Sequence, residues 1–370
     1  MSGPSSTPGT GTGPAERPRR VPVRSDLQAM EGYHSPQVEV RVRLNTNESP
    51  APPPDGWRDA VAAEVSRLDW HRYPDRGAHN LRAAIADLHG VEVEQVFAAN
   101  GSNEVLQCLL LAFGGPGRRA LVFEPTYALH SHISRITATE IVTGSRDDDF
   151  QIDPQDAEAL LGGALPDITF LCSPNNPTGR AEPPETVAKI LQSAPGLVIV
   201  DEAYGQFSPF SALDLRGPGQ PGLVVTRTFS KTWAMAGARL GYVVADPAVV
   251  QACEAVVLPY HLSAQTQLAG LLALRHVPEM EARVARISEE RGRMTAALGD
   301  LPVDSWPSDA NFILFRPRQR DADEVWRSLL AQSVLIRNCA SWDGLRGCLR
   351  VTIGTPDEND RFLRALKECL

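Results

Sequence analysis

The chain has 370 residues, 42% of them hydrophobic and 22% charged, which is typical of a soluble globular protein. Its net charge of −9 disfavours binding to nucleic acid, although a local site for a small anion is compatible with it. Six scattered cysteines without C-x-x-C spacing predict neither a disulfide framework nor a metal site, and favour reduced thiols in a cytoplasm.

The first part of the chain differs in composition from the rest. Residues 1–30 are rich in Gly, Pro, Ser and Thr, which predicts a disordered tail. They contain no apolar stretch of the kind that a signal peptide has, and no run in the whole chain approaches the length of a membrane span. We therefore predict a cytoplasmic protein that contacts no membrane.

Strand and helix patterns begin after the tail. Residues 38–44 alternate as in a half-buried strand, and a proline run at 52–54 predicts an extended arm, which we place at residues 31–60. Helices are predicted over about 57–68 and 80–89. Short apolar runs then alternate with helical patterns, and the predicted strands are 96–99, 120–123, 140–143, 168–172, 197–200, 223–226 and 240–245. A further helix is predicted from 104 to about 113.

This alternation predicts an α/β fold with a mostly parallel sheet flanked by helices. We assign it to a large domain over residues 61–258. A helical pattern over 262–297, strands at 311–315, 334–336 and 349–353, and a helix from about 358 predict a smaller α+β domain over residues 259–370.

Polar residues follow several of these apolar runs directly. Because ligands bind at the carboxyl ends of parallel strands, these residues should converge on one site. They are the stretch 100–103 (NGSN), Tyr127, Asn176, Asp201 with Tyr204, and Ser230 with Lys231. This convergence is the strongest inference that the pattern alone supports.

The stretch 226–241 (TRTFSKTWAMAGARLG) combines a lysine with hydroxyls and an arginine. A lysine that forms a Schiff base needs surroundings that lower its pKa, and Thr228, Ser230 and Arg239 suit an anion held beside the amine of Lys231. The stretch 100–103 before a helix would add backbone amides to this anion site. Taken singly, Lys231 could instead be an exposed lysine, and residues 100–103 a helix cap.

Asp201 follows four apolar residues, and a buried carboxylate requires a partner such as a protonated pyridine nitrogen. It could otherwise be a helix N-cap. Tyr127 could stack on a ring or fill the core, and Asn176 and Tyr204 could bind a ring hydroxyl or be turn residues. His130 and His132 lack metal spacing and a nearby carboxylate in the sequence, so we predict that they are structural or exposed.

The ordered set of motifs resembles the fold-type-I pyridoxal-phosphate-dependent aminotransferases, and within them the histidinol-phosphate aminotransferase family in its actinobacterial form. The matching segments cover nearly the whole chain beyond the tail; they include LNTNE at 44–48, RYPD at 72–75, ANGSNE at 99–104, EPTY at 124–127, PNNPTG at 174–179, VDEAY at 200–204, TRTFSK at 226–231 and LRVTIG at 349–354.

The resemblance implies a transamination between histidinol phosphate and 2-oxoglutarate, with pyridoxal 5'-phosphate as the cofactor. Lys231 would bind the cofactor covalently and move the proton, and Asp201 would bind the pyridine nitrogen. Asn176 and Tyr204 would meet the ring hydroxyl, and Tyr127 would stack on the ring. The residues implied to hold the phosphate are Gly101, Ser102, Asn103, Thr228, Ser230, Arg239 and, from the neighbouring subunit of a homodimer, Tyr73. Those implied to meet the substrate are Tyr33, Asn47, Arg337 and Arg350.

The sequence departs from the family pattern at Ser49, Thr232, Trp233 and Asn338, which leaves the cofactor set intact but places substrate identity in question. The alternatives are therefore an aromatic amino-acid or secondary-metabolism aminotransferase, and more distantly a phosphothreonine-type decarboxylase on the same scaffold. A ligand sensor fused to a DNA-binding module is a non-enzymatic alternative, and the tail lacks the features of such a module.

Overall fold

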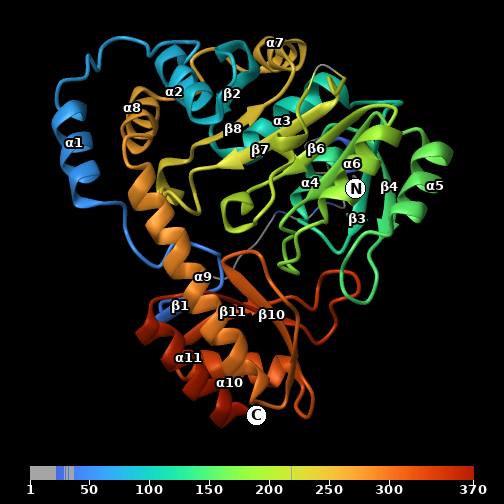
Figure 1. The fold of residues 1–370 in the computed structure, drawn as a ribbon, viewed down its shortest axis with the longest axis vertical. Coiled ribbons are helices and arrows are strands. Elements are labelled where there is room, and N and C mark those ends of the chain that lie inside the picture. The colour runs from blue at the N-terminus through green and yellow to red at the C-terminus, as the bar shows by residue number, and fades with distance from the viewer. Residues whose placement is uncertain (1–21, 29, 31, 33–36, 218) are drawn as a thin grey trace, which may run out of the picture. The chain divides into compact units, whose positions relative to one another are not determined.

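The computed structural model describes residues 22–28, 30, 32, 37–217 and 219–370, and the chain forms two compact units, residues 1–34 and 35–370. The described part of the first unit contains the exposed 3-10 turn η1 (Ser25–Leu27). All further elements belong to the second unit, whose two sheets and surrounding helices are seen in Figure 1.

The larger sheet has seven strands in the order β2-β8-β7-β6-β5-β3-β4. They are β2 (Val96–Ala99), β3 (Arg119–Glu124), β4 (Glu140–Ser145), β5 (Ile168–Cys172), β6 (Leu197–Asp201), β7 (Leu223–Thr228) and β8 (Gly241–Val244). Only β8 runs against the other six. The central strands β5 and β7 are buried at every position, because helices cover both faces of the sheet.

Alternate side chains of each strand enter different cores. Leu171 of β5 and Val225 of β7 pack in one core, whereas their neighbours Phe170 and Val224 pack in the other. The first core is closed by α2 (His79–His89), α5 (Pro154–Ala164), α6 (Pro184–Ser193) and α8 (Ala264–Ala273), and the second by α3 (Gly101–Phe113), α4 (Leu129–Ile136) and α7 (Pro247–Val256). The turns η2 (Val93–Gln95), η3 (Gly205–Phe207), η4 (Ala212–Leu215) and η5 (Ala236–Ala238) connect these elements.

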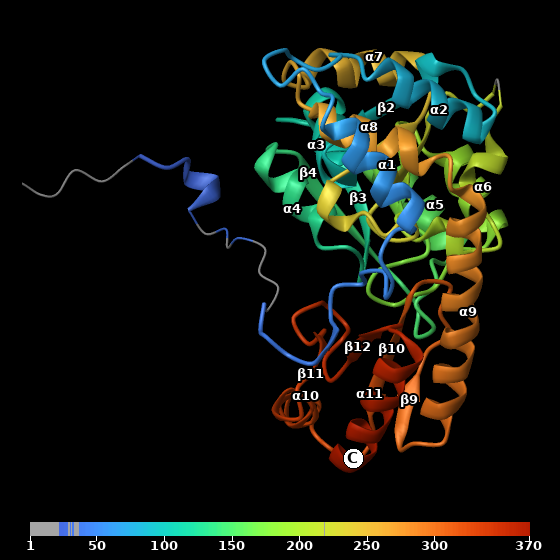
Figure 2. The same ribbon diagram turned by 90° about the vertical axis from the view of Figure 1, so that its left-hand side faces the viewer.

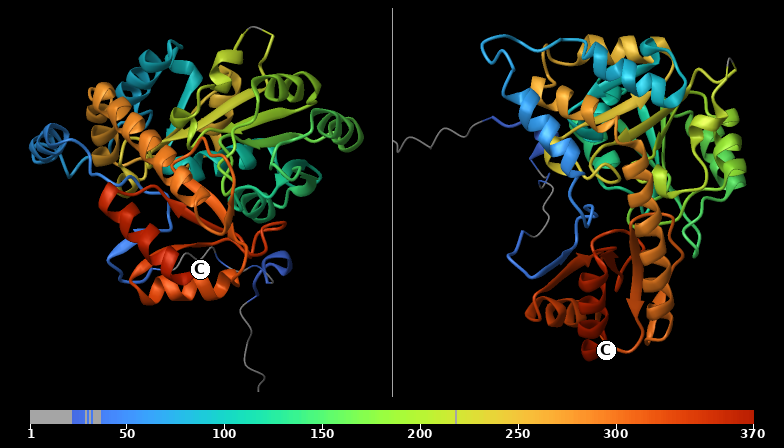
Figure 3. Two further views of the ribbon diagram at one scale, coloured as in Figure 1. Left: turned by 60° about the horizontal axis from the view of Figure 1, so that its bottom comes forward. Right: turned by 60° about the vertical axis from the view of Figure 1, so that its left-hand side comes forward.

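The smaller sheet has the order β1-β11-β12-β10-β9, in which only β1 pairs in parallel. Its strands are β1 (Val42–Leu44), β9 (Val303–Ser305), β10 (Phe312–Pro317), β11 (Val334–Asn338) and β12 (Leu349–Thr352). Helices α10 (Ala322–Ala331) and α11 (Pro356–Cys369) pack beside it, and the chain segment of β1 lies next to these C-terminal elements in Figures 2 and 3.

The long helix α9 (Val277–Gly299) connects the two cores. Its Met280 packs in the core of the larger sheet, whereas Ile287 and Met294 pack in the core of the smaller one. Helix α1 (Asp55–Val65) packs on α8, so the chain passes from the smaller sheet at β1 to the larger sheet at α1 (Figure 1).

The α/β class is confirmed, and the large sheet is mostly parallel as predicted. Most predicted elements match to within one to three residues at each end, and three further differences bear on the fold. The strand predicted at 38–44 is only Val42–Leu44, the helix predicted from 104 begins at Gly101, and the helical pattern at 262–297 is two helices that break before Val277. The predicted limits at residues 30, 60 and 258 stay predictions. Among the described residues, no helix is both long and apolar enough to cross a membrane.

Candidate functional site

The topology brings the polar residues that follow the strands to one edge of the larger sheet. Strands β2, β3, β5, β6 and β7 all end at this edge, and the antiparallel strand β8 begins there. Because Arg239 lies just before the start of the antiparallel strand β8, it is at the same edge of the sheet as the residues that follow the other strands. In the register of the sheet, Gly241 is paired with Ala99 on one side and with Thr228 on the other.

Lys231 lies in the turn after β7, where it is half-buried. Its Nζ donates a hydrogen bond to the carbonyl oxygen of Thr46 at 3.1 Å and lies 5.7 Å from the ring centroid of Tyr204. Burial, followed by the nearby Arg350 and Arg239 cations, lowers the pKa of Lys231 to about 8, although Glu48 acts in the opposite direction. Its amine is therefore partly neutral near pH 7.

We expect this pKa to be visible in amine labelling of the cofactor-free protein. An ordinary lysine titrates near 10.4, so at pH 7.4 Lys231 should have roughly 200 times as much neutral amine. Since only the neutral amine reacts, labelling of Lys231 should rise with pH through a midpoint of about 8. The chain has two other lysines, Lys189 and Lys367, which serve as internal references for peptide mass spectrometry. Co-titration of all three lysines would contradict the prediction.

A candidate anion site lies near this lysine, at the amino end of α3. Asn100 provides no side-chain cap to α3, so the first backbone N–H groups of the helix lack partners within it. Arg239 Nη1 lies 3.4 Å from Ser230 Oγ, which in turn is 3.0 Å from Thr228 Oγ1. We call these three side chains and the amino end of α3 the anion site.

Two glycines allow this close arrangement. Gly101 has a φ of +79°, and a Cβ atom at this position would lie 2.6 Å from Nη2 of Arg239. A Cβ atom on Gly241 would lie 2.2 Å from the backbone nitrogen of Ser102. Larger residues would push Arg239 and β8 away from the end of α3, so both glycines are needed for the anion site.

Tyr127 and Asn103 lie together at the same edge. Tyr127 is half-buried, its hydroxyl donates to Asn103 Oδ1 at 3.3 Å, and its ring meets that of His130 edge-on at 5.6 Å. Tyr127 is therefore only partly buried and does not simply fill the core.

Asp201 is the last residue of β6 and not a helix N-cap. Its side chain is buried, with Oδ1 accepting from the backbone N–H of Ala203 at 3.1 Å and Oδ2 lying 3.1 Å from Nε2 of His130. In the described part of the chain, no arginine or lysine forms an ion pair with Asp201. A buried carboxylate without such a cation fits a protonated nitrogen of a ligand.

His130 was predicted to be structural or exposed, and the sequence did not reveal its contact with Asp201. The imidazole is fully buried between Asp201 and Phe170, whose ring stacks on it at 4.6 Å. The residue lies one turn beyond Tyr127, and its backbone N–H donates to the Tyr127 carbonyl. This spacing was the only available signal, because Asp201 is 71 residues away in sequence.

Tyr204 and Asn47 are joined directly. Asn47 Nδ2 donates to the Tyr204 hydroxyl at 2.9 Å, and the Thr352 hydroxyl donates to Asn47 Oδ1 at 3.0 Å. Asn311 Nδ2 donates to the Asn47 carbonyl at 3.1 Å. Asn47 has a φ of +55°, a conformation that these hydrogen bonds hold in place.

Asn176 is joined to an arginine of the smaller sheet. Its Oδ1 accepts from Nη1 of Arg350, and the second terminal nitrogen of Arg350 donates to the Asn45 carbonyl at 2.9 Å. Arg350 Nε is buried and has no hydrogen-bond partner among the described residues. Arg337 lies directly opposite Arg350 in the β11–β12 ladder and packs its guanidinium on the Trp342 ring at 5.0 Å.

One predicted residue, Tyr73, is not brought to this edge. It is 79% exposed and its ring stacks on that of Tyr260 at a centroid distance of 4.5 Å. Tyr33 lies outside the described residues. Within the described ranges, no group of three or more His, Cys, Asp or Glu side chains is arranged to hold a metal ion.

Residues 40–366 match the model of the aminotransferase class I and II family, so the chain belongs to this class. Among its relatives are the histidinol-phosphate aminotransferases of Frankia casuarinae, 47% identical over 97% of this chain and 94% of the relative, and of Mycobacterium avium, 48% identical over 93% and 88%. The chain is thus a member of the histidinol-phosphate aminotransferase family.

Solved structures agree with this fold. The histidinol-phosphate aminotransferase of Clostridium acetobutylicum has a TM-score of 0.82 at 23% identity, covering 88% of this chain and 98% of its own. That of Sinorhizobium meliloti, in complex with pyridoxal 5'-phosphate, has a TM-score of 0.81 at 24% identity, covering 90% and 91%. The fold is therefore that of the fold-type-I pyridoxal-phosphate-dependent enzymes, as the sequence predicted.

Proposed function

We infer that the protein exchanges an amino group between histidinol phosphate and 2-oxoglutarate, giving imidazole acetol phosphate and glutamate, with pyridoxal 5'-phosphate as its cofactor. The observation that carries this proposal is the amine of Lys231. This amine has a pKa near 8. Lys231 follows strand β7, which pairs with the strand that ends at the buried Asp201, and the proposed anion site and the Arg337–Arg350 pair complete the set of groups that the family reaction needs.

The described residues fit each part of this cofactor. The anion site suits its phosphate, Asp201 suits a protonated pyridine nitrogen, Tyr127 offers a face for the ring, and Asn176 and Tyr204 offer polar groups for the ring hydroxyl. When bound, the cofactor supplies an electron-withdrawing ring that stabilises negative charge at the substrate carbon.

The chain itself would position the reactants and move the proton. A Lys231 amine with a pKa near 8 can accept a proton at neutral pH and return it, as a general acid–base group needs. The carbonyl of Thr46 and the ring of Tyr204 hold this amine in place. Asp201 is buried, and its contacts with the Ala203 N–H and with His130 hold the carboxylate in one orientation.

The anionic end of the substrate would be bound by Arg350 and Arg337. Like charges directly opposite each other in a ladder repel, so this pair is favourable when an anion lies between the two guanidinium groups. Both a carboxylate and a phosphate fit such planar donors, so the same pair can serve both substrates of an alternating reaction.

Two departures from the family pattern are next to site residues in the sequence, Thr232 after Lys231 and Asn338 after Arg337. The side-chain contacts of Ser49, Trp233 and Asn338 nevertheless lead elsewhere. Trp233 is buried against Phe229, Ser49 donates to the Ala51 carbonyl at 2.9 Å, and Asn338 donates to Asp323 at 2.5 Å. None of these contacts reaches the anion site or Asp201. The relatives do not favour an aromatic amino-acid aminotransferase.

A half-reaction tests the substrate. Holo-protein would be mixed separately with histidinol phosphate, glutamate and phenylalanine, and the change in cofactor absorbance followed. Fast conversion by the first two and slow conversion by phenylalanine is the expected result. Fast conversion by phenylalanine, with none by histidinol phosphate, would overturn the proposed substrate while keeping transamination.

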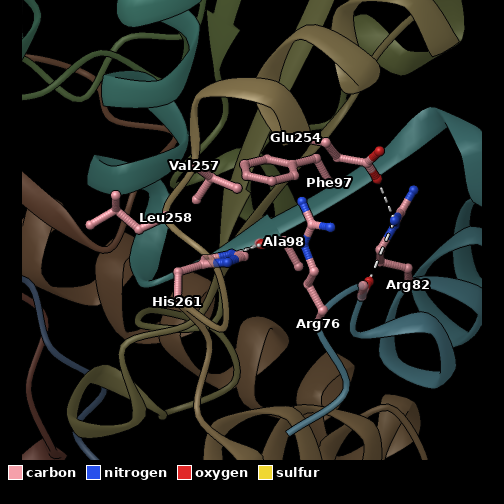
Figure 4. Close-up of a pocket in the computed structure, with 9 residues that line it drawn as sticks. Arg76, Arg82, Phe97, Ala98, Glu254, Val257, Leu258 and His261 are labelled. Carbon is pink, nitrogen blue, oxygen red and sulfur yellow. Dashed lines mark hydrogen bonds and ion pairs between the residues drawn. The ribbon is translucent and has the colours of Figure 1, made fainter. Parts of the chain in front are cut away.

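We also propose a homodimer in which Tyr73 reaches the neighbouring anion site. Its loop and the α7–α8 connection expose Trp70, Tyr73, Leu258 and Tyr260, of which Tyr73 and Leu258 are more than three-quarters exposed. A cavity of about 250 Å³ lies between the same two segments, lined by Arg76 and Leu258 among others (Figure 4). Exposed aromatic and apolar side chains gathered beside a cavity are typical of a protein interface.

Tyr73→Phe tests this arrangement. Loss of a hydroxyl that binds the cofactor phosphate should weaken cofactor affinity by roughly 10–100-fold, the range for a hydrogen bond to a charged group. Cofactor binding would be measured by equilibrium dialysis, and the oligomeric state by sedimentation. Tyr260→Phe, which keeps the ring stack, is the matched control. Equal cofactor affinity in Tyr73→Phe and the unmodified protein would argue against the shared site.

The proposed location is the cytoplasm. All six cysteines are free and buried, and burial raises the pKa of Cys108 to about 12 and that of Cys339 to about 11. Free thiols in these positions agree with a reducing compartment.

A further inference from the structure

Arg283 is a buried arginine on α9 that donates to two separate segments. The residue is 5% exposed, with Nη1 donating to the Thr232 carbonyl at 3.0 Å and Nη2 donating to the Pro52 carbonyl at 2.9 Å. Thr232 directly follows Lys231. Pro52 lies in the arm segment, which we define as residues 45–54 between β1 and α1.

These two segments meet again at the reactive amine. Thr46 of the arm segment accepts the hydrogen bond from Lys231 Nζ, and Asn47 donates to Tyr204. One guanidinium therefore fixes the backbone next to Lys231 and the backbone six residues beyond Thr46. Because the donors of arginine form a rigid planar fork, the positions of the two carbonyls are coupled.

The charge of Arg283 is not explained by an ion pair. Among the described residues, no carboxylate forms an ion pair with it and its Nε has no hydrogen-bond partner, while burial and then the Arg286 cation lower its pKa. Placing a charged group in such surroundings opposes folding unless hydrogen bonds offset the loss of water. The two carbonyls provide that offset, and both belong to the segments that hold Lys231.

The arm also packs against the lysine turn through apolar groups. Pro53, Pro54 and Trp57 line a small cavity together with Trp233 and Arg283. Trp57 donates to the Ala269 carbonyl at 2.9 Å, which fixes the far end of the arm on α8. Arg283 is thus placed between an anchored arm and the turn of the lysine.

We propose that Arg283 is a positioning residue that holds the arm segment against the Lys231 turn, so that the amine stays between the Thr46 carbonyl and the Tyr204 ring. The proposal rests on the proposed role of Lys231 in transamination. Arg283 touches no reacting group itself. Its effect on the reaction passes through the positions of Thr232 and the arm, so its removal should alter the surroundings of Lys231.

The variant Arg283→Met removes both donors and keeps an apolar stem. Two readouts on the cofactor-free protein do not depend on turnover: the pH midpoint of amine labelling at Lys231, and hydrogen–deuterium exchange in peptides covering residues 45–56 and 229–236. The cations that face Lys231, Arg350 and Arg239, lie outside the arm segment and are not altered. Glu48 lies within the segment and raises the pKa of Lys231, but burial is the larger effect, so access of water decides the direction of the shift. Arg286→Met is the matched control, because Arg286 lies on the same helix and is exposed.

Loosening the arm admits water to the amine, so the labelling midpoint should rise from about 8 toward the ordinary lysine value near 10.4. The rate of hydrogen–deuterium exchange in both peptides should increase about 10-fold, because these segments open locally while the rest of the protein stays folded. Arg283→Lys keeps the charge but loses the fork, and it should shift both readouts in the same direction. Arg286→Met should leave both unchanged.

Unchanged labelling and exchange in a folded Arg283→Met protein would overturn the proposal. If that variant does not fold, Arg283→Lys is the test. Labelling and exchange in Arg283→Lys that match those of the unmodified protein would show that the planar guanidinium is not needed, and would also overturn the proposal. Failure of the proposed function would look different, because unmodified Lys231 would then neither titrate near pH 8 nor hold the cofactor, whatever Arg283 does.

Discussion

Lys231→Ala is expected to abolish transamination, with a loss of at least about 10⁴-fold, because a covalent and proton-transferring group is removed outright. The visible absorbance of the lysine-bound cofactor should also disappear. Alanine fills less space in a half-buried turn whose backbone is held by Phe229 and Arg283, so thermal unfolding should change little. Stopped-flow turnover and cofactor absorbance measure the two effects.

The control for this variant is Lys189→Ala. Lys189 lies on α6 and pairs with Glu158 at 3.0 Å, in surroundings where an ion pair contributes little. Its loss should leave turnover and cofactor absorbance unchanged. Transamination that persists in Lys231→Ala would remove the basis of the proposed mechanism, because the only other lysines in the sequence are Lys189 on α6 and Lys367 on the last helix.

Asp201→Asn is expected to lower kcat by roughly 10³-fold while leaving the substrate KM within a few-fold of its original value. Asparagine keeps the size of the side chain and can accept the hydrogen bond from Ala203, but it lacks the negative charge that would keep a ring nitrogen protonated. The loss should therefore fall on the chemical step. Steady-state kinetics separates kcat from KM, and nitrogen-15 NMR of labelled cofactor reports whether the ring nitrogen is protonated.

Thr226→Val is a suitable comparison for Asp201→Asn. The Thr226 hydroxyl lies 3.4 Å from Asp201 Oδ1, so the variant removes a weak neighbour and keeps the charge. It should lower kcat far less. If Asp201→Asn kept both full kcat and a protonated ring nitrogen, Asp201 would not be the partner of the ring.

Most of the sheet was predictable because its strands are continuous apolar runs. Strands β2 and β5 match their predicted bounds, and the other strands of the larger sheet differ by one or two residues at their ends. Buried strands are marked by β-branched and aliphatic residues on both faces, a local signal. Helix ends were harder: α3 begins three residues early, since Gly101, Ser102 and Asn103 are inside its first turn rather than before it.

The helical stretch 262–297 shows a second limit. Its composition is continuous, but the chain breaks after α8, and α9 begins at Val277 with a proline in its first turn. Residues of α9 then pack in two different cores, and the periodicity of apolar residues within the helix does not reveal this division. The short predicted strand at 38–44 was reduced to Val42–Leu44 because only these residues pair with β11.

The sequence by itself determined which residue types carry the chemistry, because the residues after each predicted strand are read directly from the chain. It also predicted that these residues lie together, because parallel strands end at the same edge of a sheet. Only the tertiary structure decided the partners: His130 on Asp201, Thr46 on Lys231, Asn176 on Arg350 and Arg283 between two carbonyls. These contacts join residues dozens to hundreds of positions apart. Their distances depend on how the helices and the arm pack, and packing leaves no local trace in composition or periodicity.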